Sequence, residues 1–299
     1  MSSLRRREAH MPHVPSKLGR WLNSLPRQWK WLFPVHASRR LYLVENDITT
    51  PRLPRQLHGL KIAYASDIHY GQLLDDARVD DLVERLNALD ADIIILGGDY
   101  GEDAAHTKKL FERGLPLKAR LAVCAVLGNH DRAGEEGDAD EIAELMIKNG
   151  ITPLINSTIS MMIDGVKLCI CATDDLEHGE PAFADVRDQV FGADYVIYAP
   201  HSPDSLEALR EDVGEPFYDL ALCGHTHGGQ VTFFGFAPCA SSLYGLRYGN
   251  EYLTGEIEED DGVWLMISNG VGTSWMPLRF GAPAQYHLIT LRRERTERS

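Results

Sequence analysis

Beyond residue 59, the pattern of hydrophobic and polar positions alternates between two periods. Short and nearly continuous apolar runs are typical of strands that are buried on both faces. Between these runs, apolar residues recur every three or four positions, as on one side of an amphipathic helix. In the first part of the chain the predicted strands are 60–66, 92–96 and 121–127, and the predicted helices are 75–89, 104–113 and 139–149. Strand–helix–strand repetition predicts a mainly parallel sheet with helices on its faces.

The pattern changes in the middle of the chain. Residues 158–163 and 166–172 flank Asp164-Gly165, a dipeptide that favours the tight turn of a β-hairpin. The later predicted elements are helices at 183–190 and 204–211 and strands at 195–199, 219–223, 231–234, 252–257, 263–268 and 286–291. The whole order predicts an α/β fold in which two mixed β-sheets pack together with helices on the outside.

Composition divides the chain into an arm at 1–58, one domain at 59–292 and a charged tail at 293–299. An apolar share of 44% supplies the core of the domain. No apolar run approaches the roughly 18 residues of a spanning helix, and no secretory signal is visible. The five cysteines stand mostly in apolar surroundings, so we expect reduced core residues of a cytosolic protein. A zinc or redox role for Cys169 and Cys171 is the alternative.

The arm at 1–58 is basic, whereas the chain as a whole is acidic. It holds eleven Lys and Arg against three Asp and Glu, a net +8, so the remaining residues carry −22 within a total of −14. Trp21, Trp29 and Trp31 are interleaved with cationic side chains, and Pro26 divides the segment into two short amphipathic pieces. Such a segment suits the headgroup zone of an anionic bilayer, and we favour peripheral membrane contact. The alternatives are packing of the tryptophans on the domain and, least favoured, binding of single-stranded nucleic acid.

Five predicted strands end in residues that can bind metal ions. The segments are Asp67-Ile68-His69, Gly97-Gly98-Asp99, Gly128-Asn129-His130-Asp131, His201 after Pro200, and Gly224-His225-Thr226-His227. Each segment alone has an ordinary explanation, such as a turn or a helix cap. Because ligands bind at the carboxyl ends of strands in open α/β sheets, their joint occurrence predicts one common site. His106 and His178 compete with His201, which we favour because it follows a strand and precedes a helix.

This series of motifs resembles the calcineurin-like metallophosphoesterase superfamily over roughly residues 60–291. The strings at 224–230 (Gly-His-Thr-His-Gly-Gly-Gln), 268–272 (Ser-Asn-Gly-Val-Gly) and 277–281 (Pro-Leu-Arg-Phe-Gly) are similar to a bacterial branch of phosphodiesterases that often carry an N-terminal membrane anchor. The sequence departs from that branch in its amphipathic arm, and at 283–285, where Pro-Ala-Gln replaces the usual Pro-Pro-Glu. The resemblance implies an αββα sandwich over 59–292.

The resemblance also implies a centre of two divalent metal ions. Asp67, His69 and His227 would hold one ion, Asn129, His201 and His225 would hold the other, and Asp99 would bridge both. Two such ions contribute about +4, and two carboxylates with a hydroxide contribute about −3, so the site keeps a positive charge that attracts phosphate. Mixed nitrogen and oxygen ligands suit Mn, Fe, Zn or Co, and the sequence leaves the choice among them open.

The implied activity is hydrolysis of a phosphate ester or pyrophosphate bond by in-line attack of a hydroxide held between the ions. His130 would contact the phosphate or protonate the leaving oxygen. Asp131 would orient His130 or simply cap the loop. Arg247 and Arg279 are the candidates to grip the phosphate, although surface ion pairing is the favoured role for each.

The favoured function is therefore a phosphodiesterase, cytoplasmic and peripheral on the inner face of the membrane. Candidate substrates are a lipid-linked pyrophosphate such as UDP-diacylglucosamine, a phospholipid headgroup and a cyclic nucleotide, and the arm favours the lipid-linked class. The alternative activity is a phosphomonoesterase. A protein Ser/Thr phosphatase is disfavoured because Tyr100-Gly101-Glu102 stands where those enzymes have Asp-Arg-Gly. A metal-bound scaffold without catalysis is disfavoured because every ligand type is present, and nucleic acid is not an expected partner.

Overall fold

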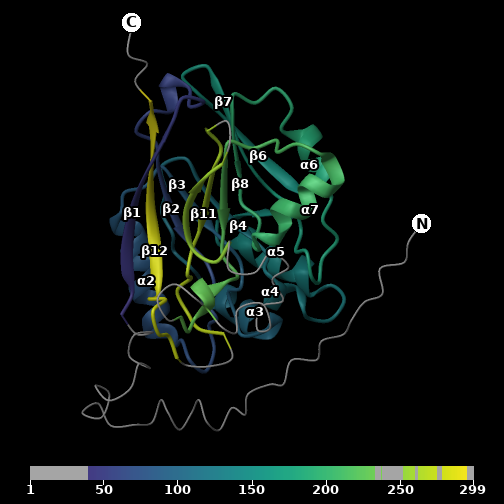
Figure 1. Ribbon diagram of the computed structural model, residues 1–299. Helices are drawn as coiled ribbons and strands as arrows, with labels where there is room; N and C mark the ends of the chain where they lie inside the picture. The colour runs from purple at the N-terminus through teal and green to yellow at the C-terminus, as the bar shows by residue number, and fades with distance from the viewer. Residues whose placement is uncertain (1–39, 233–236, 238–251, 260–261, 275–277, 295–299) are drawn as a thin grey trace, which may run out of the picture.

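A computed structural model describes residues 40–232, 237, 252–259, 262–274 and 278–294, which form two six-stranded sheets (Figure 1). The first sheet contains, in spatial order, β1 (Tyr42–Thr50), β12 (Gln285–Arg293), β2 (Lys61–Ala65), β3 (Ile93–Leu96), β4 (Ala122–Val126) and β5 (Thr152–Leu154). The second sheet contains β10 (Gly255–Glu258), β11 (Trp264–Ile267), β9 (Leu220–Cys223), β8 (Tyr195–Tyr198), β7 (Val166–Ala172) and β6 (Ser157–Ile163).

Both sheets are mixed, as the sequence predicted. In the first sheet β2, β3, β4 and β5 run parallel, and β12 joins β2 in the antiparallel direction. In the second sheet β7, β8, β9 and β11 run parallel, and the antiparallel strands β6 and β10 form its two edges. Each sheet therefore has a parallel centre, and the carboxyl ends of those central strands lie together at one edge.

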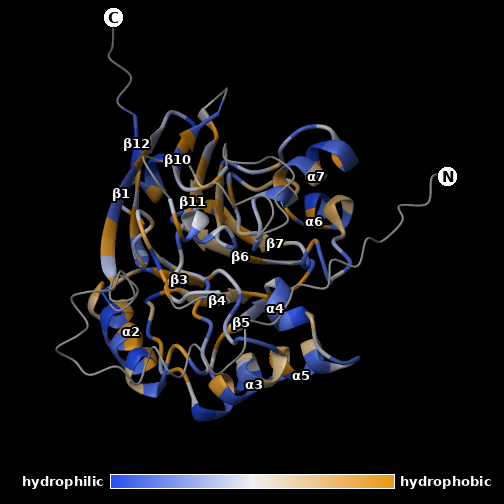
Figure 2. Ribbon diagram, turned by 60° about the horizontal axis from the view of Figure 1, so that its bottom comes forward, coloured by the Kyte–Doolittle hydropathy of each residue, from blue (hydrophilic) through white to orange (hydrophobic). Residues whose placement is uncertain are grey.

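Helices cover the outer face of each sheet, which gives four layers and confirms the predicted α/β sandwich (Figure 2). The helices on the first sheet are α2 (Asp76–Ala88), α3 (Ala104–Arg113) and α5 (Asp138–Lys148), and those on the second are α6 (Phe183–Gln189) and α7 (Asp204–Val213). The short elements η3 (Arg55–Leu57), α4 (Asn129–Arg132) and η4 (His227–Gly229) complete the described chain. Capping carboxylates begin α2 and α3: Asp75 accepts from Arg78 N, and Asp103 accepts from His106 N.

The main core lies between the two sheets. Alternate residues of one strand enter different layers: Ile93 and Ile95 of β3 pack in the core between the sheets, whereas Ile94 and Leu96 pack against the helices. This arrangement follows from the two-residue period of a strand. Because both faces of β3 are covered, its sequence is a continuous apolar run with no polar alternation.

The described part of the predicted arm contains a strand of the first sheet. Within residues 40–58, β1 pairs with β12 along its whole length, from Tyr42 opposite Gln285 to Thr50 opposite Arg293. The burial of Asn46, Ile48 and Thr50 alternates with exposed positions, as expected for an edge strand with one covered face. Sequence analysis missed this strand because polar Asn46 and Thr50 alternate with apolar Val44 and Ile48 on its covered face. Residues 1–39, with the three tryptophans, lie outside the described residues, and within the described part no helix is both long and apolar enough to cross a bilayer.

Smaller differences follow the same logic. The three-residue strand β5 was not predicted, because Pro153 at its centre argues against a strand except at the edge of a sheet, where β5 lies. The predicted strand 231–234 lies partly outside the described residues. Cys124, Cys169, Cys171 and Cys223 are buried and free, as expected, and Cys239 lies outside the described residues.

The position of β1 predicts the effect of two matched substitutions. Ile48 is fully buried between the sheets, and Leu43 on the same strand is 39% exposed. We expect Ile48→Ala to lower the free energy of unfolding by about 2–5 kcal/mol, because it leaves a cavity in the core. Leu43→Ala should change it by roughly 0.5 kcal/mol or less. Urea unfolding of both variants tests this, and equal, small effects would show that β1 is not part of the cooperative domain.

Candidate metal centre

The residues predicted to bind metal converge at the edge where the parallel strands of both sheets end. Asp67 follows β2, Asp99 follows β3 and Asn129 follows β4 in the first sheet. His201 follows β8 and His225 follows β9 in the second sheet. The backbone N–H groups also join the sheets here, since His225 N donates to both carboxylate oxygens of Asp67, at 2.9 and 3.1 Å.

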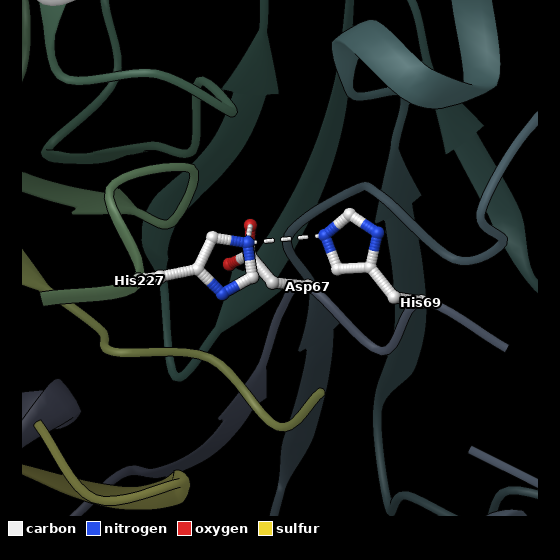
Figure 3. Close-up of side chains that lie close together, drawn as sticks. All are labelled: Asp67, His69 and His227. Carbon is white, nitrogen blue, oxygen red and sulfur yellow. Dashed lines mark hydrogen bonds and ion pairs between the residues drawn. The ribbon is translucent and has the colours of Figure 1, made fainter. Parts of the chain in front are cut away.

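The first group consists of Asp67, His69 and His227, all buried (Figure 3). The Nε2 atoms of the two imidazoles face each other at 3.1 Å. At this separation a proton or a cation must lie between two nitrogen lone pairs. The Asp67 Oδ1 atom is 3.7 Å from His227 Nε2, and the ligand atoms of all three residues lie within 4.8 Å of one another.

The second group consists of Asp99, His201 and His225, to which Asn129 adds an amide oxygen. His225 Nδ1 lies 3.3 Å from His201 Nε2 and 3.0 Å from Asn129 Oδ1. The Oδ2 atom of Asp99 is 3.3 Å from His201 Nε2 and 3.6 Å from His69 Nε2. One carboxylate oxygen therefore lies between the two groups, in the position expected of a shared ligand.

The backbone is strained at most of these residues. Values of φ between 49° and 69° occur at Asp67, His69, Asp99, His225 and His227. Residues other than glycine rarely adopt this left-handed region, and each costs roughly 1–3 kcal/mol unless its surroundings fix it. Glycine is required nearby, because a Cβ on Gly128 would lie 2.2 Å from an Asp99 carboxylate oxygen. Such strain is typical of a functional site.

Asp131 holds one of these strained turns in place, a role that the sequence left open between orienting His130 and capping the loop. Its buried carboxylate accepts from the N–H groups of Asp99, Tyr100 and Gly128, at 2.8–3.0 Å. It also accepts from the Thr107 hydroxyl at 2.6 Å. Asp131 thus ties the loop after β3 to the loop after β4, and it raises the precision with which Asp99 is placed.

The charges of the residues in both groups depend on burial and on close neighbours. Burial lowers the pKa of His69 to about 3 and the pKa of His227 well below the usual value, so both rings are uncharged at neutral pH. Burial raises the pKa of the Asp67 carboxyl. Burial alone would also raise the pKa of Asp99. The neighbouring His201 and His130 outweigh burial, so the pKa of Asp99 lies well below its usual value.

His201 carries the compensating charge. Burial disfavours a charged imidazole, but Asp99 and Asp67 outweigh burial and raise the pKa of His201 well above its usual value. Its Nδ1 atom donates to the Gly97 carbonyl oxygen at 2.7 Å, which directs Nε2 toward the carboxylates. Two carboxylates, four imidazoles and one amide, all directed at one buried edge, are a donor set that fits divalent cations.

His130 lies beside these groups and is held by its own partners. Its backbone N–H donates to Asp99 Oδ1, and its Nδ1 donates to the Glu102 carbonyl oxygen, both at 2.9 Å. The ring packs edge-on against His69, with centroids 4.8 Å apart. Burial lowers the pKa of His130, but the Asp99 charge and the Glu102 carbonyl outweigh it, so the net pKa is raised.

Of the two predicted substrate-binding arginines, the structure describes one. Arg247 lies outside the described residues. Arg279 is fully buried, and its guanidinium bonds to backbone carbonyls and to the His227 ring, which is not the exposed position expected of a phosphate ligand. The competitors of His201 lie elsewhere: His106 pairs with Asp103 on α3, and His178 lies in a turn held by Asp175.

Sequence analysis did not single out an ion pair next to the site. Arg132 immediately follows the Gly-Asn-His-Asp segment and pairs with Asp174, a buried residue in the loop after β7. Asp174 is fixed in turn by the N–H groups of Asp175 and Glu180. The only sequence signal was the adjacency of Arg132 to the metal motif, and its partner lies 42 positions away.

Comparison with known proteins agrees with this geometry. The model of the family described as calcineurin-like phosphoesterase matches residues 60–229. An uncharacterized protein of Bacillus subtilis, YpbG, is 29% identical over 243 residues, which cover 78% of this chain and 81% of that protein. The uncharacterized metallophosphoesterase YkuE of the same species is 29% identical over 83% of this chain and 84% of its own length. Phosphodiesterase YaeI of Escherichia coli is 31% identical over 62% of this chain and 68% of its own length.

The raised pKa of His201 predicts that metal binding releases a proton. The ring is charged at neutral pH without metal, whereas a metal ligand must be neutral, so a bound ion displaces about one proton from His201. Metal affinity should therefore rise with pH through this pKa. Titration calorimetry with Mn²⁺ at pH 7, in buffers of different ionisation enthalpy, measures the release. His201→Ala should reduce it and the matched His106→Ala should not; identical release in all three proteins would contradict this account.

Proposed function

The chain belongs to the calcineurin-like phosphoesterase family, which makes it a metal-dependent phosphoric ester hydrolase, and we propose that it cleaves phosphodiester or pyrophosphate bonds. The observation that carries the proposal is the placement of Asp99 Oδ2 between two groups of buried ligand atoms, at 3.3 and 3.6 Å. The likeness to a phosphodiesterase supports the diester over the monoester.

The proposed ligands are Asp67, His69 and His227 for one ion, Asn129, His201 and His225 for the other, and Asp99 for both. Two divalent ions held there would lower the pKa of a water molecule and stabilise the charge that develops on the phosphate. A neutral amide at Asn129, where a carboxylate would also fit a metal, preserves the positive charge that draws the substrate in. Mn, Fe, Zn and Co all suit these ligands.

His130 is the proposed proton donor. Its Nδ1 is committed to the Glu102 carbonyl oxygen, which leaves Nε2 as the atom that can exchange a proton with the leaving oxygen of the substrate. The bond from its N–H to Asp99 keeps the ring in register with the ligands. General acid catalysis by a positioned histidine contributes about 10²–10⁴-fold to rate.

We further propose that the natural substrate is lipid-linked, in the manner of UDP-diacylglucosamine, and that the protein acts at the inner face of the membrane. The strand β1 supports this orientation. Tyr42 begins β1 and lies opposite Gln285, whose N–H donates to Gly270 O. Val271, which follows Gly270, donates its N–H to the carbonyl oxygen of Ser66, the neighbour of Asp67. The segment 1–39, with its basic residues and tryptophans, therefore joins the body about 10 Å, or two strand spacings, from the metal edge. An arm bound to anionic lipid would turn that edge toward the bilayer.

Paired substitutions separate the two proposed roles at the site. Wild-type protein with Mn²⁺ should hydrolyse bis(p-nitrophenyl) phosphate faster than p-nitrophenyl phosphate, and chelation should abolish both rates. Asp99→Ala should lose bound metal and turnover together, because it removes the ligand that both ions share. His130→Ala should retain the metal, measured by elemental analysis, and lose about 10²–10⁴-fold in kcat. A preference for the monoester would overturn the diesterase assignment, and loss of metal in His130→Ala would make His130 a ligand.

The arm is tested in the full-length chain. Wild-type protein should float with anionic vesicles, and the Trp21→Ala, Trp29→Ala, Trp31→Ala triple variant should remain at the bottom of the gradient, because tryptophan side chains anchor at the headgroup level. Turnover of bis(p-nitrophenyl) phosphate should be equal in both proteins, whereas hydrolysis of UDP-diacylglucosamine in vesicles should fall in the variant. Equal flotation would refute membrane contact by the arm. A shift of single-stranded RNA by wild-type protein alone would favour nucleic acid instead.

A further inference from the structure

Arg279 is a fully buried arginine surrounded by backbone carbonyl groups. Its Nε donates to Gly272 O at 2.8 Å, and its Nη1 donates to His227 O and Ala282 O, both at 3.1 Å. Its Nη2 donates to Asn269 O at 2.6 Å and lies 3.0 Å from His227 Nδ1. A planar guanidinium with five donors can join several acceptors in fixed directions, which a lysine cannot do.

Two of these acceptors belong to a segment that lies directly on Asp67. The segment 269–272 follows β11, and Gly272 N donates to Asp67 O at 2.7 Å, while Val271 N donates to Ser66 O at 3.0 Å. The approach is close, because a Cβ on Gly272 would lie 2.1 Å from Ile68 O. A displacement of this segment must therefore move the turn that carries Asp67.

Apart from the Ala282 carbonyl, the remaining contacts are with His227, whose carbonyl and ring both lie against the same guanidinium. One side chain thus contacts a ligand of the first group and the backbone that braces a second ligand, Asp67. His227 and Asp67 are 160 positions apart and come from different sheets, and both have left-handed backbone torsions. Arg279 thus joins these two turns in addition to the bond from His225 N to the Asp67 carboxylate.

The contribution of Arg279 must be geometric, because its charge has the wrong sign. A guanidinium next to the ring of a metal ligand repels a divalent cation, so attraction cannot explain its place. The second group depends on different supports: His201 is directed by the Gly97 carbonyl, and Asp99 is held by Asp131. Removal of Arg279 should therefore disturb one half of the centre more than the other.

We propose that Arg279 is a positioning residue that sets the geometry of the Asp67–His69–His227 half of the metal centre and does not contact substrate. This inference rests on the metal centre proposed above. It gives Arg279 a role different from the phosphate ligand that the sequence suggested. Residues that orient metal ligands from behind change metal affinity by about 10–100-fold when they are substituted.

The test measures metal binding without substrate. Co²⁺ is titrated into metal-free protein and followed by calorimetry and by visible absorption, which reports the geometry around each ion. His225→Ala and His69→Ala identify which binding phase belongs to which group. We expect Arg279→Lys, which keeps the charge but loses the planar fork, to weaken the phase of the Asp67 group by about 10–100-fold and change its spectrum. The affinity of the phase that belongs to the His201 group should change by about threefold or less, which is small compared with that effect.

A second variant and a matched control distinguish a local effect on metal binding from a general folding defect. Asn269→Ala loosens the segment from its other side by removing bonds to Pro283 O and Thr254, and it should weaken the same phase. Arg210→Lys alters a partly buried arginine on α7, which pairs with Glu207 and Glu259, and should leave both phases unchanged. Unchanged binding in both Arg279→Lys and Asn269→Ala, or equal weakening of both phases, would overturn the proposal. Diester turnover of the wild type is measured separately, so a failed hydrolysis assay refutes the proposed function and leaves this inference standing.

Discussion

Two carboxylates, Asp67 and Asp99, are buried at the edge where the two sheets meet, and their charge must be balanced there. Burial penalises a carboxylate strongly unless a positive charge lies close by. His201 supplies part of that charge, because the two carboxylates raise its pKa, whereas burial lowers the pKa of His69 and of His227. Divalent cations would replace that proton and coordinate the other rings. The site is thus an electrostatic arrangement that metal ions complete.

The fold supports this arrangement from behind. Left-handed torsions at the ligand positions persist only when surrounding groups fix them. Asp131 fixes the turn of Asp99 from the first sheet, and Arg279 fixes the turn of His227 from the C-terminal segment. The two supports have opposite charges. Each joins backbone segments that are far apart in the sequence, so the precision of the site depends on the whole sandwich.

Much of the fold could be predicted because buried strands leave a clear trace in the sequence. The central strands are covered on both faces and therefore appear as continuous apolar runs, such as Ile93–Leu96. The edges were harder to predict. The covered face of β1 mixes polar and apolar residues, and β5 contains a proline, so neither shows the expected pattern. Edge strands are defined by the partner that they pair with, and β1 pairs with β12 across more than 240 positions.

For the site, the sequence by itself determined the chemical inventory: which aspartates, histidines and asparagine follow strands, and hence the family to which the chain belongs. Spacing was sufficient because parallel strands deliver their carboxyl ends to one edge. Only the tertiary structure decided which other side chains hold these metal-binding residues in place. It buried Arg279 behind His227 and paired Arg132 with Asp174. The sequence does not show whether an arginine binds a phosphate or a backbone carbonyl, because the partners that define its role come close to it only in the folded chain.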